Sequence, residues 1–247
     1  EIRFCDWSSD VCSSDLICVD RIEEIKALGF RSMLDPCPND LGRDVELMAQ
    51  AAQKTGFQII CATGLYKQAE GGQAYWQLMR AFGSNVDAMA EMFIRELTEG
   101  IAGTGIRAGI IKVGTGDGAM TDYERCVFEA AARAAAATGA LITTHTDHGT
   151  LGDEQQRLLT RLGVPANHIV IGHSCGSSSS AYHMQIARGG SYLGFDRFGA
   201  EFIMPDAERV RCLLELIRSG AGDRVVISHD RDRKSTRLNS SHRTGSR

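Results

Sequence analysis

The sequence has no histidine before His145, and its eight cysteines include no Cys-x-x-Cys pair. Scattered cysteines of this kind are typical of reduced thiols in a cytosolic protein and argue against a disulfide framework. No apolar run is long enough to cross a bilayer, and no signal peptide is visible. The formal net charge is -4, and no long basic run lies between residues 17 and 231. We therefore expect a cytoplasmic protein that binds neither membranes nor nucleic acids.

The two ends of the chain are polar and rich in serine. Residues 6–15 read DWSSDVCSSD, and residues 232–242 read DRKSTRLNSSH. A DNA stretch that encodes the second segment also encodes the first on its opposite strand, and it looks like a sequencing adapter. We therefore expect residues 1–16 and 232–247 to be adapter-derived artefact around a truncated natural domain, residues 17–231. The alternative is a genuine disordered tail at each end, in which case the complementarity of the two coding DNA stretches would be a coincidence.

Short apolar runs alternate with amphipathic helical patterns along the natural part. The predicted strands are residues 31–35, 57–64, 107–116, 140–145, 168–173, 191–196 and 223–230. The predicted helices are residues 19–30, 43–56, 86–101, 121–139, 153–163, 181–190 and 205–220. One helix start is specific, because Thr121 followed by Glu124 forms a capping box. Strict alternation of this kind predicts a parallel sheet with crossover helices.

The number of strands points to one architecture. Seven strands, with a helix before the first, imply an eighth strand further upstream and hence an incomplete α/β (β/α)₈ TIM barrel without its first strand and C-terminal part. We expect the sheet to stay open between the strands around Met33 and Val226, where apolar side chains would be exposed. The alternative is a doubly wound open sheet, which would carry a phosphate loop after its first strand. GTGDG, residues 114–118, follows a middle strand and reads as a turn.

The later strands end in chemically capable residues. Lys112, His145, His173, Asp196 and Asp230 each close an apolar run. In such a barrel the carboxyl ends of the strands meet on one face, where active sites are built. Five consecutive strand ends of this type predict a metal centre or an acid/base centre. The alternative for Lys112 is a structural partner of a nearby acid.

The segments GIRAGIIKVGTG, LITTHT, IVIGHS, GFDRFG and VVISHD resemble the phosphotriesterase family of the amidohydrolase superfamily. The resemblance implies a TIM barrel with two divalent metal ions, usually zinc, with cobalt, manganese or iron as alternatives. It implies that Lys112, carboxylated by CO₂, bridges the ions and that His145 and His173 are ligands. Asp230 would be a ligand and the catalytic acid/base. The family's His-x-His pair on the first strand is absent from this chain.

Substrate contacts are implied by the same resemblance. Arg197 and Tyr66 look like substrate-binding residues of the lactonase-like branch, with Asp196 beside them. Arg197 stands where the organophosphate hydrolases have a histidine, so lactones and carboxylic esters are favoured over phosphotriesters. Arg197 could instead form a surface ion pair, and Asp196 could brace Arg197 or the barrel rim. Cys175 could face the pocket or be a plain buried thiol, and His148, His183 and His229 are expected to be satisfied polar residues.

The sequence thus predicts a metal-dependent hydrolase that directs a metal-bound hydroxide at a small ester-like substrate. Because the His-x-His pair is absent, we expect this truncated chain to be poorly active. A homodimer is left open. The alternative function is a non-catalytic barrel fragment that binds at most one metal ion, because the His-x-His pair is absent. A metal-free sugar-phosphate barrel enzyme is a third interpretation. It would need phosphate-binding glycines late in the barrel, and GFDRFGAEF is not such a loop.

Overall fold

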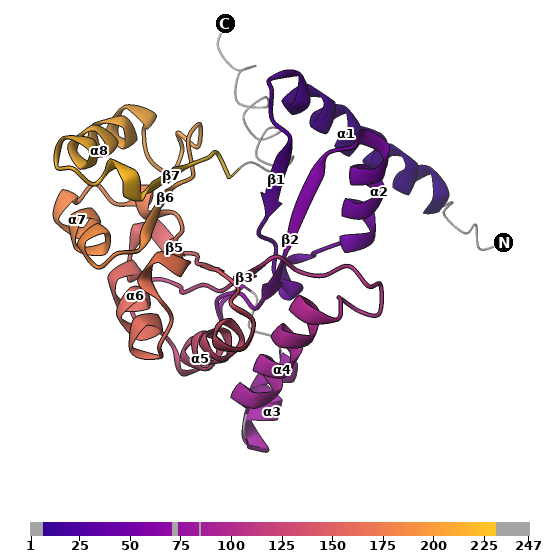
Figure 1. Ribbon diagram of the computed structural model, residues 1–247, viewed down its shortest axis with the longest axis horizontal. Helices are drawn as coiled ribbons and strands as arrows, with labels where there is room; N and C mark the ends of the chain where they lie inside the picture. Colours follow the sequence, from indigo (N-terminus) through magenta and orange to yellow (C-terminus); the bar gives the residue numbers. More distant parts are fainter. Residues whose placement is uncertain (1–6, 71–73, 84, 231–247) are drawn as a thin grey trace, which may run out of the picture.

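A computed structural model of the 247-residue chain describes residues 7–70, 74–83 and 85–230. Its seven strands form one parallel sheet in the order β1 to β7, and the sheet curls with its helices on the outside (Figure 1). The strands are β1 Ser32–Asp35, β2 Gln58–Gly64, β3 Ile110–Lys112, β4 Ile142–Thr143, β5 Ile169–Ile171, β6 Tyr192–Phe195 and β7 Val225–Ile227. This arrangement confirms the predicted incomplete (β/α)₈ barrel, and every predicted strand is present.

The register keeps equivalent apolar residues side by side through the middle of the sheet. Ile111 pairs with Ile142, Ile142 with Ile169, and Leu193 with Val225. The ladders are shorter than the predicted apolar runs, and β4 pairs at only two positions, Ile142 and Thr143. Lys112 is the last paired residue of β3. The other strand-end residues singled out by the sequence lie just after the paired residues of their strands: His145, His173, Asp196 and Asp230.

The sheet is open between its two outer strands. Among the described residues, no strand lies between β1 and β7. Met33 and Leu34 of β1 are 37% and 40% exposed, and Val226 and Ile227 of β7 are 43% and 59% exposed. The predicted opening, with its exposed apolar edges, is therefore confirmed.

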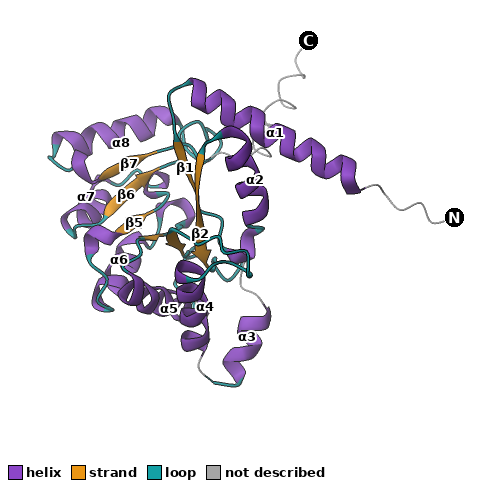
Figure 2. Cartoon of the chain, turned by 45° about the vertical axis from the view of Figure 1, so that its right-hand side comes forward, coloured by secondary structure: helices purple, strands orange, loops and turns teal. Residues whose placement is uncertain are grey.

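The helices cover the outer face of the sheet (Figure 2). They are α1 Trp7–Ala27, α2 Val45–Thr55, α3 Ala74–Ala81, α4 Asn85–Thr98, α5 Asp122–Thr138, α6 Gly152–Arg161, α7 Ser180–Arg188 and α8 Asp206–Arg218. None of the helices in the described part of the chain is long and apolar enough to cross a membrane. The seven predicted helices are present, and α3 is an addition that the sequence pattern did not indicate.

The first helix also differs from its prediction, because α1 begins at Trp7 and thus includes residues 7–16. The assignment of residues 1–16 and 232–247 to an artefact stays a prediction. Residues 1–6 and 232–247 lie outside the part that the structure describes.

Local signals explain where α5 starts and stops. Thr121 Oγ1 accepts the backbone N–H of Glu124, and the Glu124 carboxylate accepts the N–H of Thr121, which confirms the capping box. At the other end Gly139 adopts a φ of 75°, which a glycine tolerates and most residues do not. Between these points the small side chains of α5 pack closely against α4 and the sheet.

The main core lies between the sheet and the helices that follow its later strands. Its strand members are fully buried: Ile111, Ile142, Ile169, Ile171, Leu193 and Phe195. Phe93 of α4 and Phe128 of α5 are also fully buried against this layer. Close packing of this kind fixes the strands relative to one another, and so it fixes the spacing of the side chains at their carboxyl ends.

Candidate metal centre

The residues that close the later strands come together at the carboxyl ends of the sheet. The imidazole rings of His145 and His173 meet edge to face, with centroids 4.7 Å apart. His173 Nε2 lies 3.8 Å from Asp230 Oδ2. Lys112 is close enough to Asp196 and Asp230 for both carboxylates to act on its pKa. The structure therefore gathers all five strand-end residues into one site, although their roles stay predictions.

Lys112 ends β3 with its side chain buried. Its Nζ donates a hydrogen bond to the carbonyl of Thr144 at 2.8 Å. Burial lowers the pKa of Lys112 from 10.5 to about 8, although Asp196 and Asp230 raise it. The neutral amine is the form that can add CO₂, and it is accessible near neutral pH. The hydrogen-bond partner of Lys112 is thus a backbone carbonyl, while the two acids act on it through charge.

Gly64 makes room for the backbone of Lys112. Its φ is 126°, and a Cβ there would lie 1.8 Å from the carbonyl oxygen of Lys112. Only glycine allows β2 to pass this close to the end of β3. The ATGLY segment therefore positions Lys112 as well as Tyr66.

His145 lies beyond β4 and is 4% exposed. Its Nδ1 is 2.8 Å from the hydroxyl of Tyr66, and its Nε2 is 2.7 Å from Oδ1 of Asp147. Burial lowers the pKa of His145 to about 3, against the opposing effect of Asp147. The ring is therefore neutral at pH 7, which is the form that binds metal ions. Gln155 holds the backbone in place, since its Nε2 donates to the carbonyl of His145 at 2.8 Å.

His173 lies beyond β5 with a φ of 58°, in the left-handed region that is uncommon for residues other than glycine. Asp196 holds it there by accepting the backbone N–H of His173 at 3.1 Å and by contacting Nδ1 at 2.9 Å. Burial raises the pKa of Asp196, but His173 and Lys112 together outweigh this, and the net shift is downward. Asp196 thus contacts His173, and the predicted contact of Asp196 with substrate stays a prediction.

Asp230 follows β7 and also has a left-handed backbone, with a φ of 44°. Arg197 Nε donates to Oδ2 of Asp230 at 3.0 Å. The Arg197 side chain is 15% exposed and that of Asp230 is 39% exposed. Arg197 is therefore paired with a carboxylate of the site that is itself partly open to solvent, and its contact with substrate stays a prediction. Two strained backbones among the predicted ligands are a pattern common at functional sites.

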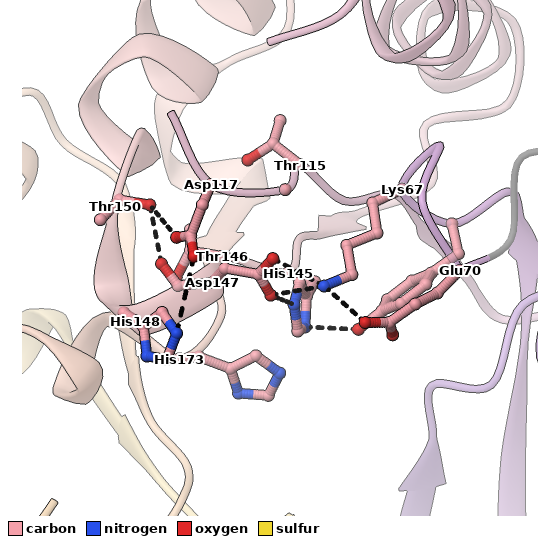
Figure 3. Close-up of polar contacts among 12 residues, drawn as sticks. Lys67, Glu70, Thr115, Asp117, His145, Thr146, Asp147, His148, Thr150 and His173 are labelled. Carbon is pink, nitrogen blue, oxygen red and sulfur yellow. Dashed lines mark hydrogen bonds and ion pairs between the residues drawn. The ribbon is translucent and has the colours of Figure 1, made fainter. Parts of the chain in front are cut away.

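Sequence reasoning missed an ion pair beside His145. Nζ of Lys67 contacts both oxygens of Asp147, at 2.7 and 2.6 Å (Figure 3). The Lys67 side chain is 7% exposed and that of Asp147 is 20% exposed. The available signal was position alone, because Asp147 stands two residues after His145 and Lys67 directly follows Tyr66.

Cys37 was also missed. It lies on the loop after β1, and its backbone N–H donates to Asp35 Oδ1 at 2.9 Å. Burial and then Asp35 raise the pKa of the Cys37 thiol to about 12, while Lys112 acts in the opposite direction. Cys37 is therefore a protonated thiol at the edge of the site.

The remaining residues that the sequence analysis discussed have the following surroundings. His148 is exposed beside Asp117. His183 is fully buried, with Nε2 2.9 Å from the carbonyl of Ser174. Cys175 is a buried free thiol that is 1% exposed. His229 also has an interaction partner. Their interpretation as structural residues stays a prediction.

The gathered side chains have the chemistry of a divalent metal site. Two imidazoles, a carboxylate and a buried lysine with a lowered pKa are suitable donors once the lysine is carboxylated. Within the described ranges, however, no three His, Cys, Asp or Glu side chains form a ready-made cluster of ligands. Lys112 is outside those four residue types, Asp230 pairs with Arg197, and Tyr66 occupies Nδ1 of His145. The donor types therefore fit a metal ion, and in this structure Asp230 and His145 form hydrogen bonds with other side chains.

Comparisons with known proteins identify the family of this chain. The sequence model of the phosphotriesterase family matches residues 10–244. A "Phosphotriesterase homology protein" of Mycobacterium tuberculosis is 37% identical over 214 residues, which cover 85% of this chain and 65% of the relative. The aryldialkylphosphatase of Saccharolobus solfataricus is 34% identical over 213 residues, which cover 86% and 66%. The chain therefore spans about two thirds of the length of these curated relatives.

Solved structures give the same result. The organophosphorus hydrolase of Deinococcus radiodurans superposes with a TM-score of 0.86 and 40% identity, covering 89% of this chain and 67% of the other. A structure from the molecular engineering of organophosphate hydrolysis activity from a weak promiscuous lactonase template has a TM-score of 0.86 and 38% identity, covering 89% and 69%. The family match, the sequence identities and the shared barrel lead to one conclusion: this chain belongs to the phosphotriesterase family.

Proposed function

We propose that the protein is a metal-dependent hydrolase of ester bonds, with lactones and carboxylic esters as favoured substrates. The observation that carries this proposal is the convergence of Lys112, His145, His173 and Asp230 at the carboxyl ends of four strands. The relatives support it through their names, which describe an aryldialkylphosphatase and an organophosphorus hydrolase. The scattered free cysteines support a cytoplasmic location.

The metal-holding residues are assigned by donor type. Lys112 as a carbamate, His145 and His173 would hold one divalent ion, for which zinc is our first choice and cobalt, manganese or iron the alternatives. Asp230 and Lys112 would contribute to a second ion. That ion also needs the family's His-x-His pair, which the sequence lacks. When bound, a divalent ion supplies a water of lowered pKa and polarises the ester oxygen.

The residues of the chain handle the proton and the substrate. Asp230 is partly exposed, and its Oδ2 is held by Nε of Arg197 at 3.0 Å, so this carboxylate can accept a proton from the attacking water. The other donors of the Arg197 guanidinium can hold a carbonyl or carboxylate oxygen of the substrate. Burial raises the pKa of Tyr66, so its hydroxyl keeps its proton and acts as a donor beside His145.

Arg197 is also the basis of the substrate preference. A planar guanidinium suits the carbonyl and ring oxygens of a lactone, because it can donate two parallel hydrogen bonds. Phosphotriester hydrolysis is the second candidate, as a side activity, because it would use the same activated water and the same polarising ion. The names of the Saccharolobus and Deinococcus relatives favour including it.

The test is a substrate panel combined with metal analysis. Purified protein is loaded with zinc or cobalt, its metal content per chain is measured, and lactones, aryl esters and phosphotriesters are assayed. We expect hydrolysis that disappears with a chelator and with His145→Ala, and lactones as the best substrates. At most one ion per chain without turnover would favour the alternative of a non-catalytic barrel fragment. Turnover that survives both the chelator and His145→Ala would refute the proposed centre.

A further inference from the structure

Each histidine of the centre has a carboxylate against one of its ring nitrogens. Asp196 Oδ1 lies 2.9 Å from Nδ1 of His173, and Asp147 Oδ1 lies 2.7 Å from Nε2 of His145. A carboxylate behind a metal-binding imidazole fixes the tautomer and the orientation of the ring. The two carboxylates contact different ring nitrogens. The nitrogen without a carboxylate is therefore Nε2 in His173 and Nδ1 in His145.

Asp147 differs from Asp196 because a lysine ammonium contacts both of its carboxylate oxygens. The Lys67 ammonium contacts both Asp147 oxygens and also Glu70 Oε1, at 2.9 Å (Figure 3). The loop that carries Lys67 is itself anchored, since Glu124 accepts the backbone N–H of Gln68 at 3.2 Å. Lys67 follows β2 and Asp147 follows β4, so the pair links two loops across β3.

This geometry selects one tautomer of His145. Asp147, with the Lys67 ammonium on both oxygens, is a carboxylate and can only accept a hydrogen bond. Nε2 of His145 must therefore carry the ring proton, and Nδ1 is the nitrogen that accepts. Tyr66 fits this arrangement, because its hydroxyl lies 2.8 Å from Nδ1 and can donate to it.

We propose that Asp147, held by Lys67, is a positioning residue that keeps His145 protonated at Nε2, so that Nδ1 is the nitrogen that would bind a metal ion in place of the Tyr66 hydroxyl. The inference rests on the proposed function only in taking His145 as a metal ligand. Asp147 does not touch the substrate in this role, and it acts through the imidazole of His145. Removal of Asp147 should therefore change which nitrogen of His145 carries the proton, even when no substrate is present.

The first experiment observes the ring directly. The full chain is labelled with ¹⁵N-histidine, kept free of metal, and its ring nitrogens are correlated with the ring protons by NMR. The His145 signals are those that disappear in His145→Gln. In the unaltered chain we expect the Nε2–H pattern. In Asp147→Ala we expect a mixture of the two His145 tautomers. Lys67→Met should give a smaller population of the Nδ1–H tautomer, and Asp147→Glu should restore part of the Nε2–H pattern.

Asp117→Ala is the matched control. Asp117 is an exposed carboxylate on a neighbouring loop, where it lies 3.6 Å from His148 and 3.3 Å from Thr150. The same substitution there should leave the His145 pattern unchanged. Circular dichroism and a cooperative unfolding transition show that each variant is folded. If Asp147→Ala fails to fold, Lys67→Met and Asp147→Asn carry the test, since both leave most of the packing in place.

The second experiment measures zinc affinity by competition with a chromophoric chelator. Loss of such a partner carboxylate typically weakens binding about 10- to 100-fold, so we expect Asp147→Ala to fall in that range and Asp117→Ala to match the unaltered chain. A folded Asp147→Ala with an unchanged His145 tautomer would overturn the positioning role. Unchanged zinc affinity in His145→Ala would instead overturn the ligand role in the proposed function, and the tautomer measurement would still decide the role of Asp147.

Discussion

His173 and Arg197 share one oxygen of Asp230. Nε2 of His173 lies 3.8 Å from Oδ2 of Asp230, and Nε of Arg197 lies 3.0 Å from the same atom. The carboxylate is thus held between a predicted metal ligand and a cation, at the open end of the sheet. Any change at Arg197 should therefore affect the orientation of Asp230 as well as the proposed contact of Arg197 with substrate.

The first prediction concerns Arg197. A hydrogen bond to a charged group contributes about 1.5–3 kcal/mol, so Arg197→Ala should lower kcat/KM for lactones about 10- to 100-fold. Arg197→Lys should recover only part of the loss, because an ammonium cannot donate in the planar fork geometry. Arg157→Ala, which removes an exposed helix ion pair with Asp153, is the control and should have no effect. An equal loss for lactones and phosphotriesters would contradict the role of Arg197 in substrate preference.

The second prediction separates stability from metal binding at Lys112. Its buried amine forms a hydrogen bond with a backbone carbonyl, and desolvation of the charged form is unfavourable. We expect metal-free Lys112→Met to be at least as stable as the unaltered chain, by up to about 1 kcal/mol in denaturant unfolding. Its zinc content should nevertheless fall sharply. Lys54→Met, on the exposed side of α2, should change neither quantity. Full zinc occupancy in Lys112→Met would refute the bridging role.

The third prediction concerns Gly64 and its neighbourhood. Its φ is 126°, and a Cβ added at Gly64 would lie only 1.8 Å from the carbonyl oxygen of Lys112, so any side chain there is unfavourable. Gly64→Ala should therefore lower the free energy of unfolding by about 3 kcal/mol or more and reduce zinc binding by displacing Lys112. Gly118→Ala isolates the backbone effect, because Gly118 has a φ of 85° but open space around it. That control should lose about 1 kcal/mol and keep its zinc affinity. Similar losses in both variants would show that the close approach is unimportant.

The site was predictable from the sequence to the extent that it depends on strand ends. In a parallel barrel every βα unit brings the residue after its strand to the same face, so Lys112, His145 and His173 could be placed together without knowing any contact. The pair of Lys67 and Asp147 could not, because the two residues are separated by 80 positions and meet only when the strands adopt their register. The ring nitrogen that each histidine presents to the interior of the site also depends on contacts that form only in the folded structure.

The same limit explains the other differences. Asp196 follows β6 as predicted, but its partner is His173, since the left-handed backbone of His173 turns its N–H toward the carboxylate. The extra helix α3 has no counterpart in the predicted βα pattern, because it belongs to a connection between β2 and α4. Loops are shaped by what they pack against, whereas strands and crossover helices follow from periodicity.

The last prediction concerns the acid stability of the fold and uses His183, which is buried in α7 and is not one of the proposed ligands. Burial lowers the pKa of His183, with Arg211 acting in the same direction and Glu215 and the Ser174 carbonyl opposing it. The unfolded chain therefore takes up a proton near pH 6.5, before the folded chain does. Stability should be fully present above that pH and should decrease as the pH falls toward the lowered pKa of the folded state.

The measurement is denaturant unfolding of the metal-free chain between about pH 7.5 and pH 5, with unaltered protein and His183→Gln compared at each pH. The limit for one proton is about 1.4 kcal/mol per pH unit. Since His145 is buried with a lowered pKa as well, it contributes to the decline in both proteins, and the difference between the two curves isolates His183. We expect His183→Gln to be less stable near pH 7.5, because it disturbs a buried contact, and to lose less stability on acidification. Parallel curves would mean that His183 is protonated equally easily in the folded and unfolded chain, and its burial would then have no part in the acid sensitivity of the fold.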